Sequence, residues 1–255
     1  MRAFRLTCLL LMLAAPMAAK AQDIVLAADE WCPYNCAADA EKPGFAVDLA
    51  KAIFEPLGYT VRYEVMPWSR AIEAARSGEV AGVIGVTRPE APDLAYPKSI
   101  LSQSRNGFFV RTDSEWSYTG RDSLDDISLG IIESYGYGDE LNDYIAAKRD
   151  DMAHVQSVSG NNALVQNIEK LLAGRIGAVI EDENVFRYTM MHWKEAQSSI
   201  KESGSAQPTP LYIAFSPEGR NTATLVKLYD AGMARLRASG QLDQYRAAYG
   251  LNAEK

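Results

Sequence analysis

The stretch SGEVAGVIG (residues 77–85) has a counterpart in the second half of the chain, AGRIGAVIE (173–181), and this pair determines the architecture that we expect. Each stretch contains a glycine of the kind that ends a helix, then a short turn, and then an apolar run typical of a buried strand. A second pair, DIVLAADE (23–30) and DISLGIIE (126–133), occurs in the same order. Two matches in one order predict two similar structural units in succession.

Between the repeated stretches, each unit alternates helical and strand patterns. In the first unit, an apolar stripe through Leu49, Ile53 and Leu57 predicts a helix, and Gly58 ends it. The stretch YTVRYEVMP (59–67) then predicts a strand. This alternation implies right-handed crossovers and a mostly parallel sheet in each unit, so the predicted fold class is α/β.

Two further strands lie outside the repeat, at NGFFVRT (106–112) and LYIAFSP (211–217). We expect them to pair as a hinge that carries the chain out of the first unit and back, with an amphipathic C-terminal helix packed on the first unit. The predicted organisation is a first lobe formed by residues 22–110 and 211–255, and a second lobe formed by residues 111–210.

Residues 1–21 have the pattern of a secretory signal peptide. Arg2 and Arg5 form a short basic region, an apolar run follows, and Ala19-Lys20-Ala21 gives the small-x-small pattern of a cleavage site. The apolar run is too short for a membrane span, so we expect cleavage after Ala21 and a soluble protein in the periplasm. An uncleaved N-terminal anchor is the alternative.

The composition excludes several classes of partner. The chain has a formal net charge of −7, and the predicted signal peptide contains basic residues but no acidic ones, so the mature protein is more acidic still. We therefore expect no binding to nucleic acid or to an anionic membrane surface. His154 and His192 lack the spacing of a metal site, so we expect no metal and no cofactor. We also expect a monomer.

Cys32 and Cys36 lie in ADEWCPYNCA (28–37), directly after the first predicted strand. In an oxidising compartment two such cysteines tend to pair, and Pro33 and Asn35 suit a tight turn between them. Their spacing differs from the C-x2-C redox motif, and zinc needs about four ligands. We favour a local disulfide; free thiols and metal or redox chemistry are the alternatives.

Taken in order, these elements resemble the family-3 extracellular solute-binding proteins, the periplasmic receptors of amino-acid-type ABC importers. The resemblance covers nearly all of the mature chain and rests on the order of several stretches: EWCPYN (30–35), GFAVDLAKAIFEPLG (44–58), PWSRAIEAARSGEVAGVIG (67–85), TRPEAPDLAYP (87–97), LAGRIGAVIEDENVFRY (172–188) and YIAFSPEG (212–219). It implies the type II periplasmic binding protein fold, in which two α/β lobes joined by two crossover strands close over a ligand.

The resemblance also implies ligand-binding positions in the first lobe. Trp31 or Tyr34 looks like the aromatic residue that walls the ligand, and Thr87 looks like the threonine that hydrogen-bonds the ligand carboxylate. The arginine that usually follows three positions later is Glu90 here, so we expect Arg88 to replace it.

In the second lobe, ESYGYGDE (133–140) resembles the turn whose backbone amides face the ligand, which makes Tyr135, Gly136 and Tyr137 candidates. Asp182 matches the acidic residue that holds an ammonium group in the family. Capping the next helix is the alternative role for Asp182.

Trp68 and Arg70, at the start of a predicted short helix, complete the candidates. Trp68 is either a pocket wall or an aromatic of the lobe surface or core. Arg70 is either a residue of the pocket or its rim, or a charge on the helix surface.

We therefore expect a protein that is not an enzyme and that delivers a small polar solute, amino-acid-like or a small carboxylate, to an ABC permease. The alternatives are a lyase of the cyclohexadienyl dehydratase type and a ligand-presenting sensor. The sequence contains no nucleophile elbow and no His-centred triad. Glu181, beside Asp182, is the candidate base for a lyase, and at most one of this pair enters the cleft because neighbours in a strand point to opposite faces.

Overall fold

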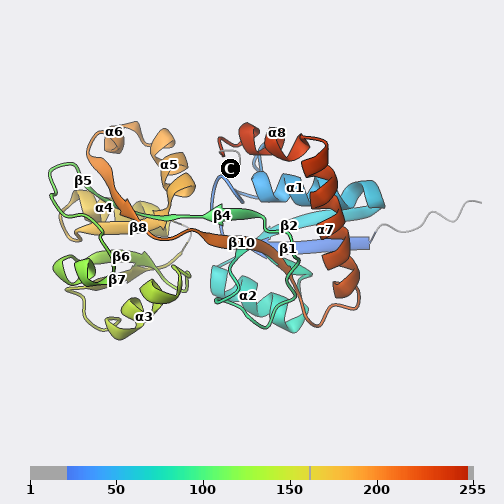
Figure 1. The fold of residues 1–255 in the computed structure, drawn as a ribbon, viewed down its shortest axis with the longest axis horizontal. Helices are drawn as coiled ribbons and strands as arrows, with labels where there is room; N and C mark the ends of the chain where they lie inside the picture. The colour runs from blue at the N-terminus through green and yellow to red at the C-terminus, as the bar shows by residue number, and fades with distance from the viewer. Residues whose placement is uncertain (1–21, 161, 252–255) are drawn as a thin grey trace, which may run out of the picture.

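The computed structural model describes residues 22–160 and 162–251, which form two α/β lobes connected by two strand crossings (Figure 1). The predicted signal peptide, residues 1–21, lies outside the described residues. None of the helices in the described part of the chain is long and apolar enough to cross a membrane. The fold class expected from the sequence is confirmed.

The first lobe contains a five-stranded mixed sheet in the order β2-β1-β3-β10-β4. Its first three strands are parallel, and β10 runs antiparallel to both β3 and β4. The strands are β1 (Gln22–Ala28), β2 (Tyr59–Val65), β3 (Gly82–Val86), β4 (Ser102–Ser104) and β10 (Thr209–Phe215).

Helices cover both faces of this sheet. In Figure 1, α1 and α8 lie above the strands and α2 lies below them, while the long helix α7 packs against α1. The bounds are α1 (Phe45–Phe54), the 3-10 helix η1 (Glu55–Leu57), α2 (Trp68–Ser77), α7 (Thr222–Ala238) and α8 (Gln241–Ala248).

The second lobe repeats this arrangement with the order β7-β6-β8-β5-β9. Again three parallel strands are followed by two antiparallel pairings. The strands are β5 (Asn106–Arg111), β6 (Leu129–Ile132), β7 (Val155–Val158), β8 (Ala178–Asp182) and β9 (Ile200–Ser205). Since β1 corresponds to β6 and β3 to β8, the two sheets have the correspondence that the repeated sequence stretches predict.

The helices of the second lobe are also distributed around its sheet (Figure 1). They are the 3-10 helix η2 (Arg121–Asp126), α3 (Asp139–Ala147), α4 (Ala163–Leu172), α5 (Glu183–His192) and the single-turn helix α6 (Lys194–Gln197). Helices α4 and α5 contact β8, the strand that ends at the junction between the lobes.

The chain crosses between the lobes at Arg105 and at residues 206–208, which differs from the expected boundaries. Strand β5 belongs entirely to the second sheet and pairs with β8 and β9, so the first crossing precedes residue 110. The expected pairing of β5 with β10 does not occur, because the hinge partner of β10 is β4. Phe108 and Phe109 explain this placement, since they are buried in hydrophobic clusters on opposite faces of the second sheet.

A tight loop follows β1 and contains the expected disulfide between Cys32 and Cys36. Inside the loop, the backbone N–H of Trp31 donates to the carbonyl oxygen of Asn35 at 2.6 Å. Gly44, immediately before α1, adopts φ 121° and lies so close that an added Cβ would be 2.4 Å from the carbonyl oxygen of Tyr34. The loop is therefore held from within and packed against the start of α1.

We expect Cys32 and Cys36 to resist alkylation in mature protein isolated without reductant, which mass spectrometry measures. A closed loop of this length contributes about 2 kcal/mol on the chain-entropy model, so reduction should lower the melting temperature by several degrees. The double variant Cys32→Ser/Cys36→Ser is the control, because its melting temperature should not respond to reductant. Two alkylated thiols in the untreated native protein would contradict the pairing.

Candidate functional site

A cavity of about 40 Å³ lies between the two lobes, lined by residues from both of them. This volume holds a few water molecules at most, and the hydrogen bonds Trp31–Glu181 and Tyr135–Asp29 join the lobes beside it. Its aromatic lining consists of Trp31, Trp68, Tyr135 and Tyr137. Its carboxylates are Asp29, Glu90 and Glu181. The remaining lining residues are Asn35, Ile84, Gly85, Thr87, Ser104, Asn106, Gly136, Thr209 and Leu211.

The lining is acidic and aromatic. No lysine, arginine or histidine is among the lining residues that the structure describes. Carboxylates attract a cation directly, and aromatic faces attract it through the ring quadrupole. Within the described ranges, no group of three or more histidine, cysteine, aspartate or glutamate residues could hold a metal ion. The site therefore combines three carboxylates with aromatic faces.

Glu90 is held by donors from both lobes. Its Oε2 accepts hydrogen bonds from the backbone N–H and the hydroxyl of Thr87, at 2.8 and 2.6 Å. Its Oε1 accepts one from the backbone N–H of Gly136 at 2.9 Å and one from Trp68 Nε1 at 3.3 Å. Burial raises the pKa of Glu90, and these hydrogen bonds partly oppose the rise because they favour the ionised form.

Asp29 follows β1 and also connects the lobes. The hydroxyl of Tyr135, on the second lobe, donates to Asp29 Oδ2 at 2.5 Å. The backbone carbonyl of Asp29 accepts hydrogen bonds from Asn35 Nδ2 at 2.6 Å and from the Tyr63 hydroxyl at 3.1 Å. Burial raises the pKa of the Asp29 carboxyl to about 6.

Glu181, in β8, is 1% exposed and reaches the cavity from the second lobe. Its Oε1 accepts hydrogen bonds from Trp31 Nε1 at 2.9 Å and from the backbone N–H of Asp182 at 2.8 Å. Its Oε2 has no partner among the described residues. Burial raises the pKa of Glu181 to about 8, so this carboxyl is mostly neutral at pH 7 in the closed cavity.

Six of the sequence candidates lie in the cavity wall: Trp31, Trp68, Thr87, Tyr135, Gly136 and Tyr137. Tyr34 lies outside that wall. It is fully buried and stacked on Trp31 with ring centroids 4.8 Å apart, and its hydroxyl accepts a hydrogen bond from Asn184 on the other lobe. This position indicates that Tyr34 supports the ring of Trp31. Arg70 is exposed on α2 and does not line the cavity, which favours the surface alternative.

The expectation that Arg88 binds a ligand carboxylate disagrees with the structure. Arg88 is exposed and stacks on the rings of Tyr96 and Tyr212, with its guanidinium carbon 4.6 and 4.9 Å from their centroids. Its Nη2 donates to the carbonyl oxygen of Pro97 at 3.3 Å. Neighbouring positions in this loop point in different directions, so Thr87 and Glu90 face the cavity while Arg88 packs outside it.

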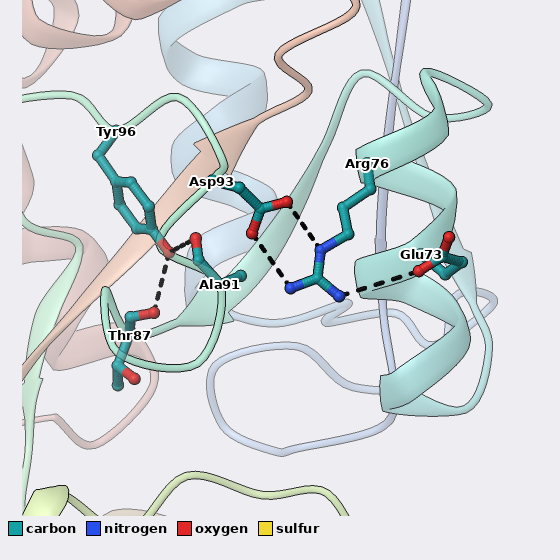
Figure 2. Close-up of polar contacts among 6 residues, drawn as sticks. All are labelled: Glu73, Arg76, Thr87, Ala91, Asp93 and Tyr96. Atoms are coloured by element: carbon teal, nitrogen blue, oxygen red, sulfur yellow. Dashed lines mark hydrogen bonds and ion pairs between the residues drawn. The ribbon is translucent and has the colours of Figure 1, made fainter.

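The loop that carries Thr87 is held in place by contacts shown in Figure 2. The Tyr96 hydroxyl lies 2.9 Å from the carbonyl oxygens of both Thr87 and Ala91. Asp93 receives two hydrogen bonds from Arg76 of α2, at 2.8 and 3.1 Å. These contacts connect the loop to itself and to α2, so they position the donors that Thr87 offers to Glu90.

Asp182 caps a helix and does not face the cavity. It is 0% exposed, and its Oδ1 accepts hydrogen bonds from the backbone N–H groups of Asn184 and Val185 at the start of α5. Its Oδ2 accepts one from the Ser104 hydroxyl at 2.8 Å. Strand alternation instead turns Glu181 into the cavity. Sequence reasoning did not select Glu181 or Asp29 as ligand-binding residues.

Comparison with known proteins places the fold. A family model described as "Bacterial extracellular solute-binding proteins, family 3" matches residues 24–252. No curated protein sequence matches. Among solved structures, an ancestral arginine-binding protein bound to arginine aligns with a TM-score of 0.73 and 18% identity, over 91% of this chain and 99% of that one.

Two other structures are similar to a comparable degree. One comes from work on glutathione import via GshT and the cystine ABC importer TcyBC of Streptococcus mutans; it has a TM-score of 0.72 and 16% identity over 90% of this chain and 95% of that one. The other is the ancestral amino-acid-binding protein AncCDT-1, a precursor of cyclohexadienyl dehydratase, with a TM-score of 0.67 and 16% identity over 89% of this chain and 94% of that one. At these identities the structures show a common fold.

We expect Glu181→Gln to remove part of the protein's pH dependence. Because burial raises the folded-state pKa of Glu181 above its ordinary value of 4.5 to about 8, the contribution of Glu181 to stability is fully present below about 4.5 and is lost as the pH rises through 8. The variant should match the wild-type melting temperature near pH 5 and exceed it near pH 9, as measured by calorimetry.

Burial also raises the pKa values of Asp29 and Asp182, to about 6. Both residues are present in the wild type and in the variant, so the difference between the two melting temperatures reports on Glu181. Glu79→Gln is the matched control, because Glu79 is exposed on the first lobe. If the melting temperatures of the wild type and Glu181→Gln instead change with pH in parallel from pH 5 to 9, Glu181 is ionised in the folded protein over this range.

Proposed function

The chain belongs to family 3 of the bacterial extracellular solute-binding proteins, and we propose that it is a periplasmic receptor that captures a small organic cation between its lobes for delivery to an ABC importer. The observation that supports this most directly is the lining of the cavity between the lobes. It combines the carboxylates of Asp29, Glu90 and Glu181 with aromatic side chains and contains no basic residue among those described.

This proposal changes the expected class of solute. The sequence predicts a zwitterion or a small carboxylate held by Arg88, but Arg88 is stacked on tyrosines outside the cavity. An anion entering the cavity would meet three carboxylates without a guanidinium or ammonium partner among the lining residues described. A cation would instead be stabilised by those carboxylates and by the faces of Trp31 and Tyr135.

Solute entry requires the lobes to separate, since the closed cavity has room for only a few waters. A larger groove of about 420 Å³ borders the cavity and shares four lining residues with it: Asp29, Trp31, Tyr135 and Glu181. The hydrogen bonds Trp31–Glu181 and Tyr135–Asp29 lie in this shared wall. Breaking them would join the two spaces, and motion about Arg105 and residues 206–208 would open the cleft.

Separate observations support the proposed location of the protein and its proposed role in delivering the solute. The signal-peptide pattern of residues 1–21 supports export to the periplasm. The family match supports a role as the receptor of an importer, with presentation of the solute to a membrane sensor as the alternative. Loss of solute uptake on deletion of the gene would favour import; retained uptake with a lost transcriptional response would favour sensing.

A lyase activity is the second candidate, favoured by one observation. Glu181 is buried in the cavity with a pKa of about 8, which suits proton transfer near neutral pH, and AncCDT-1 is described as the precursor of an enzyme. We propose that the protein binds without turnover, since prephenate- and arogenate-type substrates carry carboxylates and the described lining offers no basic residue to bind them. Multiple turnovers of prephenate- or arogenate-type substrates would establish the lyase instead.

We expect small ammonium and guanidinium compounds to raise the melting temperature of the mature protein in a thermal-shift screen. A ligand at 100 times its Kd stabilises by about 2.7 kcal/mol, which corresponds to several degrees for a chain of this size. Simple mono- and dicarboxylates should produce no shift. Trp31→Ala should weaken binding of a positive compound at least tenfold because it removes an aromatic wall.

Arg88→Ala is the matched control and should leave the affinity within a factor of two, since Arg88 lies outside the cavity. A carboxylate that binds the wild type and loses affinity in Arg88→Ala would contradict the cationic site and return Arg88 to it.

We also expect the ligand to hold the two lobes together around it. Small-angle scattering should give a smaller radius of gyration at saturating ligand than without it, because the two crossings at Arg105 and residues 206–208 act as the hinge. An unchanged radius at saturation would indicate a rigid module.

A further inference from the structure

We propose that Glu90 occupies the position of a ligand carboxylate in the cleft, so that the receptor takes organic amines and rejects the amino acids that differ from them by a carboxylate. This inference rests on the proposed function, since it names the class of cation that the same site accepts.

Glu90 has the hydrogen-bond environment of a bound anion. Both of its oxygens accept hydrogen bonds, and the donors come from the two lobes: Thr87 N–H and hydroxyl on one side, Gly136 N–H on the other, with Trp68 in addition. Backbone N–H groups and a hydroxyl converging on a carboxylate form strong charge-assisted bonds. In this protein the carboxylate that connects the lobes belongs to the chain itself.

The side chain of Glu90 also fills the space that a second carboxylate would need. A Cβ added at Gly136 would lie 2.4 Å from Glu90 Cγ and 2.6 Å from Glu90 Cδ, so the glutamate packs directly on the backbone of the second lobe. A ligand carboxylate at this point would meet Glu90 without a free donor and without a basic partner among the lining residues described. Steric contact and like-charge repulsion both exclude it.

Two polar atoms of residues that line the cavity lack a partner. Glu181 and Asn35 line the cavity and are each 1% exposed, and Glu181 Oε2 and Asn35 Oδ1 have no partner within the described part of the chain. Asn35 Oδ1 and the ionised form of Glu181 only accept hydrogen bonds, and buried acceptors without donors are costly, so these atoms point to a ligand that donates. An ammonium group brings three N–H donors and no acceptor, and its charge also favours the ionised form of Glu181.

These features assign the two ends of the ligand. The ammonium group lies near Glu181 and Asn35, the carbon chain lies along Trp31 and Tyr135, and Glu90 supplies the negative charge that an amino acid would bring with it. The ligand class is therefore an amine without a carboxylate beside its ammonium group. Primary amines, diamines and guanidino amines belong to this class.

Titration calorimetry with matched pairs tests this assignment. Agmatine and arginine, cadaverine and lysine, and histamine and histidine differ within each pair by the α-carboxylate alone. For wild-type protein, we expect at least one amine to bind ten or more times as tightly as its amino acid.

Glu90→Ala should invert this preference. The variant frees the Thr87 and Gly136 donors for a ligand carboxylate, so the amino acid of the same pair should gain at least tenfold and the amine should lose at least tenfold. Added acetate should restore amine binding to the variant, because it can occupy the vacated position. Glu79→Ala, which removes the same charge from an exposed site, should leave both affinities unchanged.

Glu90→Gln provides a second variant that keeps the shape of the side chain. It should weaken amine binding through loss of charge and still exclude the amino acid, because the carboxamide fills the same space. If the wild type binds an amino acid as tightly as its amine and neither variant changes the ratio, the role of Glu90 is overturned while a receptor for cations remains. If no amine or amino acid of the panel binds the wild type or Glu90→Ala, both this inference and the proposed cationic solute are overturned.

Discussion

Carboxylates buried at the junction of two lobes require donors, and here each takes one from the opposite lobe. Asp29 of the first lobe accepts from Tyr135 of the second, Glu90 accepts from the backbone of Gly136, and Glu181 of the second lobe accepts from Trp31 of the first. A hydrogen bond to a charged group contributes about 1.5–3 kcal/mol, and a buried group deprived of it loses its compensation for lost hydration. The closed arrangement therefore depends on these reciprocal contacts.

The same contacts connect proton binding, lobe closure and ligand binding. Burial raises the pKa values of Asp29 and Glu181 to about 6 and about 8, so closure without a cation favours their protonated forms. A cation entering the cavity would favour the ionised forms and strengthen the attraction between ligand and walls. Opening exposes the carboxylates to water and returns their pKa values toward the ordinary range. The acidic lining thus makes the balance between open and closed lobes depend on the pH and on the charge of the ligand.

The topology explains why these side chains meet. Asp29 follows β1 and Thr87 follows β3 in the first sheet, and Tyr135 follows β6 while Glu181 lies near the end of β8 in the second. In α/β sheets, ligands bind outside the carboxyl ends of the strands. The chain crosses between the lobes twice, so each sheet contains strands that lie next to a crossing. The carboxyl ends of the parallel strands in the two sheets therefore face one another across the cavity.

Local patterns in the sequence were sufficient for the repeat of two α/β units and the Cys32–Cys36 pairing, because helix and strand periods and turn residues act over a few neighbours. The aromatic and glycine positions at the cleft came from the resemblance to the family. The crossing at Arg105 was not predictable, since only packing on both faces shows that β5 is a central strand of the second sheet. The orientations of Glu181, Asp182 and Glu90 depend on hydrogen-bond donors more than 40 residues away in the sequence. These donors are Trp31 for Glu181, Ser104 for Asp182 and Gly136 for Glu90. Tertiary structure alone decides those contacts, because strand alternation sends the side chains of Glu181 and Asp182 to opposite faces but does not determine which face meets the other lobe.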